Sequence, residues 1–348
     1  MTMIFCDSFD HYTSDADILR KWDYYLAASQ VSIQASGGRR GGGCLRVSNT
    51  SNTYAVVKQV PAASTYIVGT AIKFANLTGT EYVIGFREGT VDHVTIRPNP
   101  DGSLRVYRGS TQILSSAGGL IGTGNWYYLE ILATISDTVG VVTVKLDGTT
   151  IITATGSPAA LDTRNGGTSG VIDNIAVGSA SANDTDFDDL VILNTSGSRN
   201  NSFLGDVRID CYRPNGNGAS SQFDGSDGNS TDNYLLVDDT APDDDTTYVE
   251  SATVNDVDSY TFGNMSHTPA TIKAVQLVAL CTKADAGSRS MKLVTRRSGT
   301  DYLSSEMAAP ASYRFVRDIR ETDPAAASPN DWTKTNVDAA EFGIKVSA

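Results

Sequence analysis

The chain has 348 residues, with 40 acidic against 27 basic residues and a formal net charge of −13. This acidity excludes a general nucleic-acid role, because an acidic surface repels phosphate backbones. No apolar stretch approaches the ~20 residues needed to cross a bilayer, which excludes membrane insertion. Frequent glycine (32 residues) and few charged residues (19%) are typical of an all-β protein with many turns. The length predicts two domains.

The four cysteines, Cys6, Cys44, Cys211 and Cys281, lie far apart in the sequence. They form no CxxC pair and have no histidine at zinc-ligand spacing. Two disulfides are one arrangement. The alternative, which we favour, is four thiols acting as small apolar side chains in an intracellular assembly. The first residues, MTMIFCDSFD, lack a basic region followed by an apolar run, so we expect no secretory signal.

The two ends of the first half predict how its sheet closes. IFCDSFDHY at Ile4–Tyr12 and DFDDLVIL at Asp186–Leu193 each join an acidic, turn-prone cluster to a short apolar run. A β-sandwich whose first and last strands pair has this pattern. We therefore expect one β-sandwich over residues 1–197.

Turn signals predict hairpins inside this first domain. VGVVTVKL alternates apolar and polar residues before Asp147–Gly148, a two-residue turn with positive φ, and Asp101–Gly102 is a second such turn. Trp126–Ile135 has large residues on both faces and is expected in the middle of a sheet. The run GGRRGGG at Gly37–Gly43 predicts a tight turn with both of its arginines exposed.

The second half predicts another β-domain after a short break. NTSGSRNN at Asn194–Asn201 is polar and is the candidate linker. Phe203–Pro214 alternates like a strand, whereas the following GNGASSQFDGSDGNSTDN is loop-like. KAVQLVALCTKA alternates and is rich in β-branched residues, so a strand is preferred to the alternative of a helix. The predicted fold class is all-β, with a second β-sandwich (jelly-roll) domain over 198–348 for assembly and docking.

One acidic cluster is a candidate metal site. Asp186, Asp188 and Asp189 lie in DTDFDDL. Several carboxylates on one loop suit Ca²⁺, a hard cation with oxygen ligands. The alternative is a turn stabilised by side-chain hydrogen bonds that leads into the last strand.

A second acidic cluster is a candidate docking surface. Asp243, Asp244 and Asp245 repel one another unless water, a cation or an arginine neutralises them. A solvated loop is one interpretation, and contact with Arg296 and Arg297 of a neighbouring copy is another. Ca²⁺ binding is the third.

The sequence lacks catalytic signatures. Lectin-like sandwiches that cleave glucans carry a Glu-x-Asp-x-Glu type of strand, which places two carboxylates on one face. The only Glu-x-Asp here is Glu321–Asp323, with no second Glu, and Glu130 stands alone on its strand. There is no GxSxG, P-loop or GxGxxG motif. We expect no enzyme, no catalytic residue and no cofactor, with Ca²⁺ left open.

The aromatic residues indicate sugar binding or packing. Tyrosine is frequent (15) and tryptophan is rare (3). Exposed Tyr and Trp beside Asp and Asn stack on sugars and hydrogen-bond to them. The alternative is that Trp22, Trp126 and Trp332 pack in the core or at its rim.

Several segments occur in an order that resembles a family. In chain order these segments are FCDSFDHY followed by Trp22, GRRGG, NWYYLEI, FDDLVILN, FLGDVRID, DDDTTYV, TIKAVQLVALC and DWTKTNVDAAEFGIKV. Over most of the chain this resembles structural proteins of tailed-bacteriophage particles with an N-terminal concanavalin A/laminin-G-like sandwich. The resemblance implies a non-enzymatic virion component made in the host bacterial cytoplasm.

The resemblance also implies partners and a place of action. The expected partners are other virion proteins, further copies of the chain (a trimer favoured) and a host surface glycan. A tail, fibre or collar appendage with an attachment role is expected. Capsid decoration is the alternative, and a glycan-cleaving enzyme is the remote one.

Overall fold

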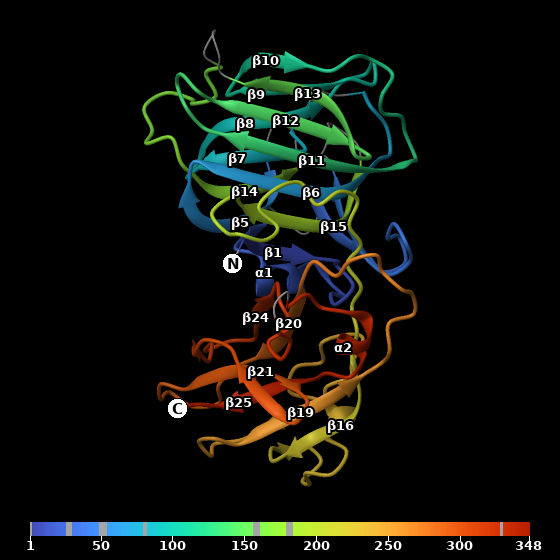
Figure 1. Cartoon of the computed structure of the whole chain (residues 1–348), viewed down its shortest axis with the longest axis vertical. Helices are drawn as coiled ribbons and strands as arrows, with labels where there is room; N and C mark the ends of the chain where they lie inside the picture. Colours follow the sequence, from blue (N-terminus) through green and yellow to red (C-terminus); the bar gives the residue numbers. More distant parts are fainter. Residues whose placement is uncertain are drawn as a thin grey trace. The chain divides into compact units, whose positions relative to one another are not determined.

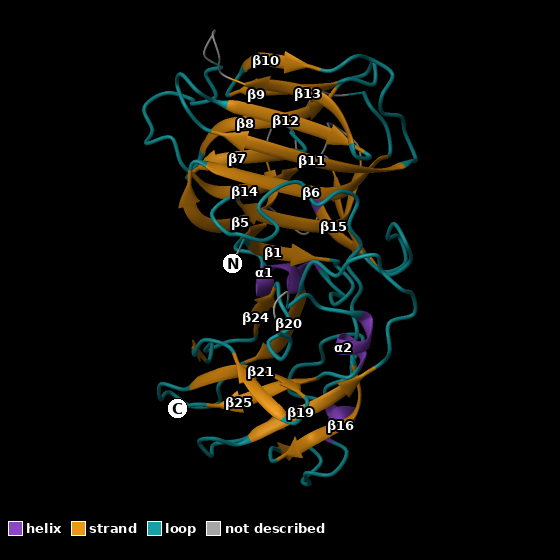
Figure 2. Cartoon of the chain, in the orientation of Figure 1, coloured by secondary structure: helices purple, strands orange, loops and turns teal. Residues whose placement is uncertain are grey.

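The computed structural model describes residues 2–25, 30–48, 54–78, 82–155, 161–178, 184–327 and 330–348. Two compact units, Met1–Asp210 and Cys211–Ala348, consist mainly of antiparallel strands and the loops that join them (Figure 1, Figure 2). The predicted all-β fold class is confirmed. Within the described ranges, no helix has the length and apolar character needed to cross a membrane.

The first unit is a sandwich of an eight-stranded and a seven-stranded sheet (Figure 1). The larger sheet contains, in spatial order, β13 (Thr149–Thr155), β12 (Val141–Leu146), β11 (Trp126–Thr134), β6 (Thr65–Phe74), β15 (Asp184–Asn194), β4 (Cys44–Ser48) and β3 (Val31–Gln34), with β1 (Met3–Asp7) also paired to β15. The smaller sheet contains β10 (Thr111–Ser115), β9 (Leu104–Arg108), β8 (Val91–Pro98), β7 (Ile84–Glu88), β14 (Ile172–Gly178), β5 (Tyr54–Ala63) and β2 (Tyr24–Tyr25). A short 3₁₀ helix, η1 (Asp15–Asp17), and α1 (Ile18–Lys21) follow β1.

The first and last strands of this unit pair, as the sequence predicts. β1 runs antiparallel to β15, from Met3 opposite Leu193 to Asp7 opposite Leu190. The β12–β13 hairpin also has its predicted turn, because Asp147 and Gly148 both have positive φ, at 49° and 81°. β11 lies between β12 and β6, which explains its large residues on both faces.

A buried carboxylate explains the acidic and aromatic residues near the N-terminus. Asp7 Oδ2 accepts hydrogen bonds from Tyr12 Oη at 2.6 Å and Trp22 Nε1 at 2.9 Å. Its Oδ1 accepts from Phe9 N at 3.1 Å and lies 3.3 Å from Lys21 Nζ. The side chains of Asp7 and Lys21 are almost completely buried. The contact between Asp7 and Lys21 therefore connects β1 to α1.

The second unit contains a six-stranded sheet and two ribbons. The sheet consists of β16 (Pro214–Ser221), β19 (Val257–Phe262), β25 (Glu341–Val346), β21 (Ser290–Arg297) and β22 (Thr300–Leu303), with β23 (Met307–Ala308) paired to β21. The ribbons are β17 (Asp224–Gly225) with β18 (Val249–Glu250), and β20 (Val275–Cys281) with β24 (Arg314–Arg320). The helices are η3 (Asn233–Leu236) and α2 (Lys334–Asp338). The predicted strand at KAVQLVALC is confirmed.

Two local predictions around the linker are wrong. The start of the segment that we predicted to be loop-like, Gly216–Ser221, lies in β16, because β16 pairs with β19 at the edge of the six-stranded sheet despite its Gly and Asn content. Conversely, 203–213 forms no strand. Leu204 N donates to Glu130 Oε1 at 2.8 Å, and Ile209 N donates to Asp189 Oδ1 at 2.6 Å.

These contacts extend the first unit beyond the boundary that we expected at residue 197. Arg39 also pairs with Asp206 at 2.5 Å, so it is engaged and largely covered, against our prediction that it is exposed. The backbone N–H groups of Leu204 and Ile209 have carboxylate acceptors in place of a neighbouring strand. The segment that contains them therefore becomes part of the first sandwich. No disulfide joins the four cysteines, all of which lie in the described ranges.

Candidate functional site

The seven-stranded sheet has a floor of small side chains on the face that points away from the core. Thr95, Gly85, Ala176 and Val57 are successive cross-strand partners on β8, β7, β14 and β5. Cross-strand partners share a face, and both sequence neighbours of Gly85 are buried in the core on the other side. The ring of Tyr54 lies on this floor, since a Cβ at Gly85 would be 2.2 Å from Tyr54 Oη.

Three tyrosines and two arginines form a continuous stack on this face, which we name the Tyr–Arg ladder. It consists of Arg87, Tyr54, Tyr82, Arg97 and Tyr107. The guanidinium carbon of Arg87 lies 4.8 Å from the Tyr54 ring centre, and the Tyr54 and Tyr82 ring centres are 5.1 Å apart. Arg97 lies 4.1 Å from the Tyr82 ring centre and 3.9 Å from that of Tyr107. Such cation–π contacts stabilise by ~0.5–2 kcal/mol each.

Hydrogen bonds hold both guanidinium groups in place. Arg87 Nε donates to Asp92 Oδ1 at 2.7 Å. Arg97 Nε donates to Thr95 Oγ1 at 3.2 Å, and its Nη2 donates to Gly109 O at 2.9 Å. The planar groups of the ladder are therefore fixed before any ligand arrives, which lowers the entropy cost of binding.

The same face has accessible aromatic and amide groups at its ends. Tyr24 on β2 is opposite Val57 and is 48% exposed. At the other end, Tyr107 Oη donates to Gln112 Oε1 at 3.4 Å, and Gln112 is exposed. Rings that stack on apolar sugar faces, together with fixed donors and acceptors for hydroxyl groups, are chemically suited to saccharides.

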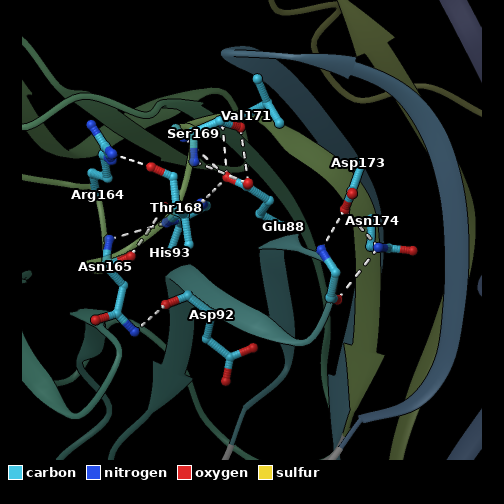
Figure 3. A network of polar contacts seen from close by, with 12 residues as sticks. Glu88, Asp92, His93, Arg164, Asn165, Thr168, Ser169, Val171, Asp173 and Asn174 are labelled. Atoms are coloured by element: carbon cyan, nitrogen blue, oxygen red, sulfur yellow. Dashed lines mark hydrogen bonds and ion pairs between the residues drawn. The ribbon is translucent and has the colours of Figure 1, made fainter.

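A polar network holds the loop before β14 against the end of β7 (Figure 3). Glu88 accepts hydrogen bonds from the backbone and hydroxyl of Ser169 at 3.0 and 2.9 Å, and from the backbone N–H groups of 170–171. His93 is buried and lies 3.3 Å from Glu88, and its Nδ1 accepts from Asn165 N at 3.0 Å. These donors, the Ser169 N–H foremost, lower the pKa of Glu88 to about 2.

This network predicts a pH dependence. Because the pKa of Glu88 is lowered from 4.5 to about 2, its stabilising contribution is present above pH 4.5 and is lost as the pH falls toward 2. We expect thermal unfolding of Glu88→Gln to depend less on pH in this window than that of the unsubstituted chain. Circular dichroism melts at several pH values measure this, with the exposed Glu306→Gln as control. Equal pH slopes for the Glu88 variant and the unsubstituted chain would contradict the assignment.

The candidate metal residues are engaged within the protein. Asp186 accepts from Arg46 Nε at 2.7 Å and Arg46 Nη2 at 3.0 Å, and it lies 2.9 Å from Lys73 Nζ. Two cations therefore already neutralise this carboxylate.

Asp188 and Asp189 are buried at a bulge in β15, where Asp189 has a positive φ of 50°. Asp188 accepts from Arg39 N at 2.7 Å and Asp189 N at 2.8 Å. Burial, followed by the neighbouring Asp189, raises the pKa of Asp188 to about 7. Burial likewise raises the pKa of Asp189 to about 6. Across the described ranges, no group of three or more His, Cys, Asp or Glu is arranged to hold a metal ion.

The two arginines of the candidate docking surface have partners in their own unit. Arg297 is 7% exposed and pairs with Asp323 at 3.2 Å. Arg296 pairs with Asp301 across the β21–β22 hairpin at 2.6 Å.

The acidic docking residues have local contacts as well. Asp243 accepts from Thr247 Oγ1 at 2.8 Å, and Asp245 accepts from Tyr313 Oη at 2.8 Å. Asp244 has a positive φ of 57°. Docking through Arg296 and Arg297 stays a prediction.

Sequence reasoning missed the ladder and considered tryptophans instead. Trp22 is completely buried, and Trp332 is 3% exposed, with its Nε1 donating to Arg320 O at 3.0 Å. Lys73 Nζ lies 4.8 Å from the Trp126 ring centre. The packing interpretation therefore fits Trp22 and Trp332. The segment LRVYR contained one signal for the ladder, because its polar residues alternate with buried apolar residues. The ladder residues that join Tyr107 lie elsewhere in the chain, so this signal did not identify them.

No protein-family model matches the chain, and no curated protein matches it. Its similarities are to solved structures. A sialidase matches with a TM-score of 0.41 at 16% identity, covering 56% of this chain and 19% of the sialidase. The Trypanosoma rangeli sialidase in complex with the inhibitor DANA matches with a TM-score of 0.31 at 14% identity, covering 47% and 27% of the two chains.

A GH131 β-glucanase catalytic domain from Podospora anserina matches with a TM-score of 0.35 at 13% identity, covering 55% of this chain and 96% of the glucanase. The chain thus spans 19% and 27% of the two sialidases. At these identities the likeness concerns the fold alone. The expectation of a structural virion component, as an appendage or as capsid decoration, is overturned, because these similar structures are sialidases and a glucanase.

Proposed function

We propose that the first unit binds glycans on the outer face of its seven-stranded sheet. The observation that carries this proposal is the Tyr–Arg ladder above the small-residue floor. The ladder groups stack on one another at 3.9–5.1 Å and are fixed on this face, and the accessible groups beside them, Tyr24 and Gln112, offer a sugar a ring to stack on and a hydrogen-bonding amide.

The arrangement supports binding without cleavage. Glycoside hydrolysis usually requires two carboxyl groups that flank the scissile bond, one of them available as an acid. On the described part of this face, Asp92 is engaged by Arg87. Glu88 is occupied by several donors, and its low pKa makes it a poor proton donor at neutral pH.

Substitution of an aromatic ladder residue tests the proposal. We expect the full chain to bind oligosaccharides on a glycan array and Tyr107→Ala to weaken that binding by about tenfold, because a stacking ring and its hydrogen bond are lost. Tyr302→Ala in the second unit is the matched control and should bind normally. Failure of the unsubstituted chain to bind any saccharide would overturn the proposal.

A further inference from the structure

His93 is the extra residue of a β-bulge on β8 and lies under the loop that precedes β14 (Figure 3). Val94 pairs with Phe86 and Asp92 pairs with Arg87, so no residue of β7 stands opposite His93. The His93 side chain is completely buried. Bulges of this kind re-aim a side chain and are common beside functional sites.

The imidazole of His93 holds this loop only in its neutral form. Nδ1 accepts a hydrogen bond from Asn165 N at 3.0 Å, and because a backbone N–H can only donate, Nδ1 must be unprotonated. The ring proton is therefore on Nε2, which donates to Glu88 Oε2 at 3.3 Å. A proton on Nδ1 would place two donors against each other in a buried site, which is unfavourable. Protonation of His93 and its contact with the loop thus exclude each other.

The charged groups around the imidazole do not offset this conflict. Among the described residues, only Glu88 makes an ion-pair contact with the ring. Charging the ring would strengthen that contact, but the Glu88 side chain is 21% exposed and solvent screens the gain. The other charged groups of the surrounding elements have partners of their own, namely Arg87, Asp92, Arg108, Asp137, Asp162, Arg164 and Asp173.

One residue of this loop contacts both groups that anchor the arginines of the ladder. Asn165 Nδ2 donates to Asp92 O at 3.1 Å, and the Asp92 carboxylate holds Arg87. The Asn165 amide also lies against Gly109, where a Cβ would be 2.7 Å from Nδ2, and Gly109 O accepts from Arg97. Release of Asn165 would therefore loosen both anchors of the ladder.

We propose that His93 is a pH switch for the glycan-binding face, in which protonation of Nδ1 releases the loop 164–171 from β8 and weakens binding. This inference rests on the proposed function and adds its regulation. The closed loop requires the neutral ring, so it is favoured at neutral pH and lost as the pH falls. Free histidine titrates near pH 6.5, so each pH unit below about 6.5 favours the released loop about tenfold. From about pH 7.5 to about pH 5.0 the equilibrium should shift about thirtyfold.

Hydrogen exchange of the Asn165 amide tests the switch without any ligand. After correction for the intrinsic pH dependence of exchange, its protection should fall about thirtyfold from about pH 7.5 to about pH 5.0. His93→Gln should abolish this change, because a glutamine offers one acceptor and one donor and does not titrate. Asp188 and Asp189 also titrate in this range, but they lie on the other sheet and are unchanged in the variant. Equal protection of the unsubstituted chain at both pH values overturns the inference.

The glycan array, read at the same two pH values, tests the link to binding. The full chain should lose about fivefold or more in apparent affinity at the lower pH, and His93→Gln should not. His267→Gln in the second unit is the matched control and should keep the loss. Thermal melts identify a variant that fails to fold. If His93→Gln does so, Asn165→Ala keeps its N–H on Nδ1 but deletes the contacts with Asp92 and Gly109, so it should bind weakly even at the higher pH.

The outcomes separate the switch from the proposed function. Loop release at the lower pH with unchanged glycan affinity overturns the regulation and leaves glycan binding standing. A pH effect that persists in His93→Gln overturns it too, because another group is then responsible. Absence of binding to the array at both pH values overturns the proposed function and its regulation together, whatever the exchange of the Asn165 amide shows.

Discussion

Asp7→Ala should destabilise the first unit by about 3–5 kcal/mol, because it leaves the buried Lys21 ammonium without its counter-charge. The side-chain hydroxyl of Tyr12 and the indole N–H of Trp22 lose their acceptor as well. Burial raises the pKa of Asp7, but Lys21, His11 and these hydrogen bonds outweigh burial and lower the pKa overall. This carboxylate is therefore ionised at neutral pH. Since domains are stable by only about 5–15 kcal/mol, the loss would approach unfolding.

Urea denaturation followed by tryptophan fluorescence measures this effect, since Trp22 contacts Asp7 directly. The double variant Asp7→Ala/Lys21→Met should cost less than the sum of the two single variants, because it removes both members of the buried pair. Asp137→Asn, which disrupts an exposed ion pair with Arg164, is the control and should change stability by under about 1 kcal/mol. Strict additivity in the double variant would show that the charge pair is not the cause.

Gly85→Ala should abolish most glycan binding while the sandwich still folds. A Cβ at this position would lie 2.2 Å from Tyr54 Oη and 2.5 Å from Tyr54 Cζ, so the ring must leave the floor. Displacing Tyr54 removes the contacts through which Tyr82 and Arg87 are stacked. We expect an overpacking cost of about 1–3 kcal/mol in stability and a more than tenfold loss of affinity. Denaturation and titration calorimetry measure the two effects separately.

Tyr54→Phe is the matched control for this variant. Tyr54 Oη is buried and has no hydrogen-bond partner among the described residues, so removing it relieves an unsatisfied polar group and should leave stability unchanged or raise it. The ring stays on Gly85, and glycan affinity should be retained. If Tyr54→Phe loses binding as fully as Gly85→Ala, the hydroxyl rather than the ladder geometry is essential.

Local patterns account for the parts of the fold that we predicted. Asp147–Gly148 forms its turn because positive φ is needed there, and the alternation in β12 places Val142 and Val144 in the core. The apolar runs at both ends of the first unit pair as β1 and β15. Each of these features depends on neighbours in sequence or on matching apolar strands.

The ladder could not be predicted in this way. Its members come from β5, from the segment before β7, and from β7, β8 and β9, and Tyr54 reaches Gly85 only because β14 lies between β5 and β7. The position of Arg97 opposite Arg105 and of Tyr107 opposite Thr95 likewise depends on the exact register of one hairpin. A shift of one residue would send one side chain to the core face.

The sequence by itself determined the all-β class, the main hairpins and the pairing of the first and last strands, because period-two alternation and turn chemistry act locally. Only the tertiary structure decided that Pro214–Ser221 is a strand, that 203–210 belongs to the first unit, and which side chains meet on the outer face. Strand order and register result from packing between distant segments, and those contacts set both the edge pairing of β16 and the ladder.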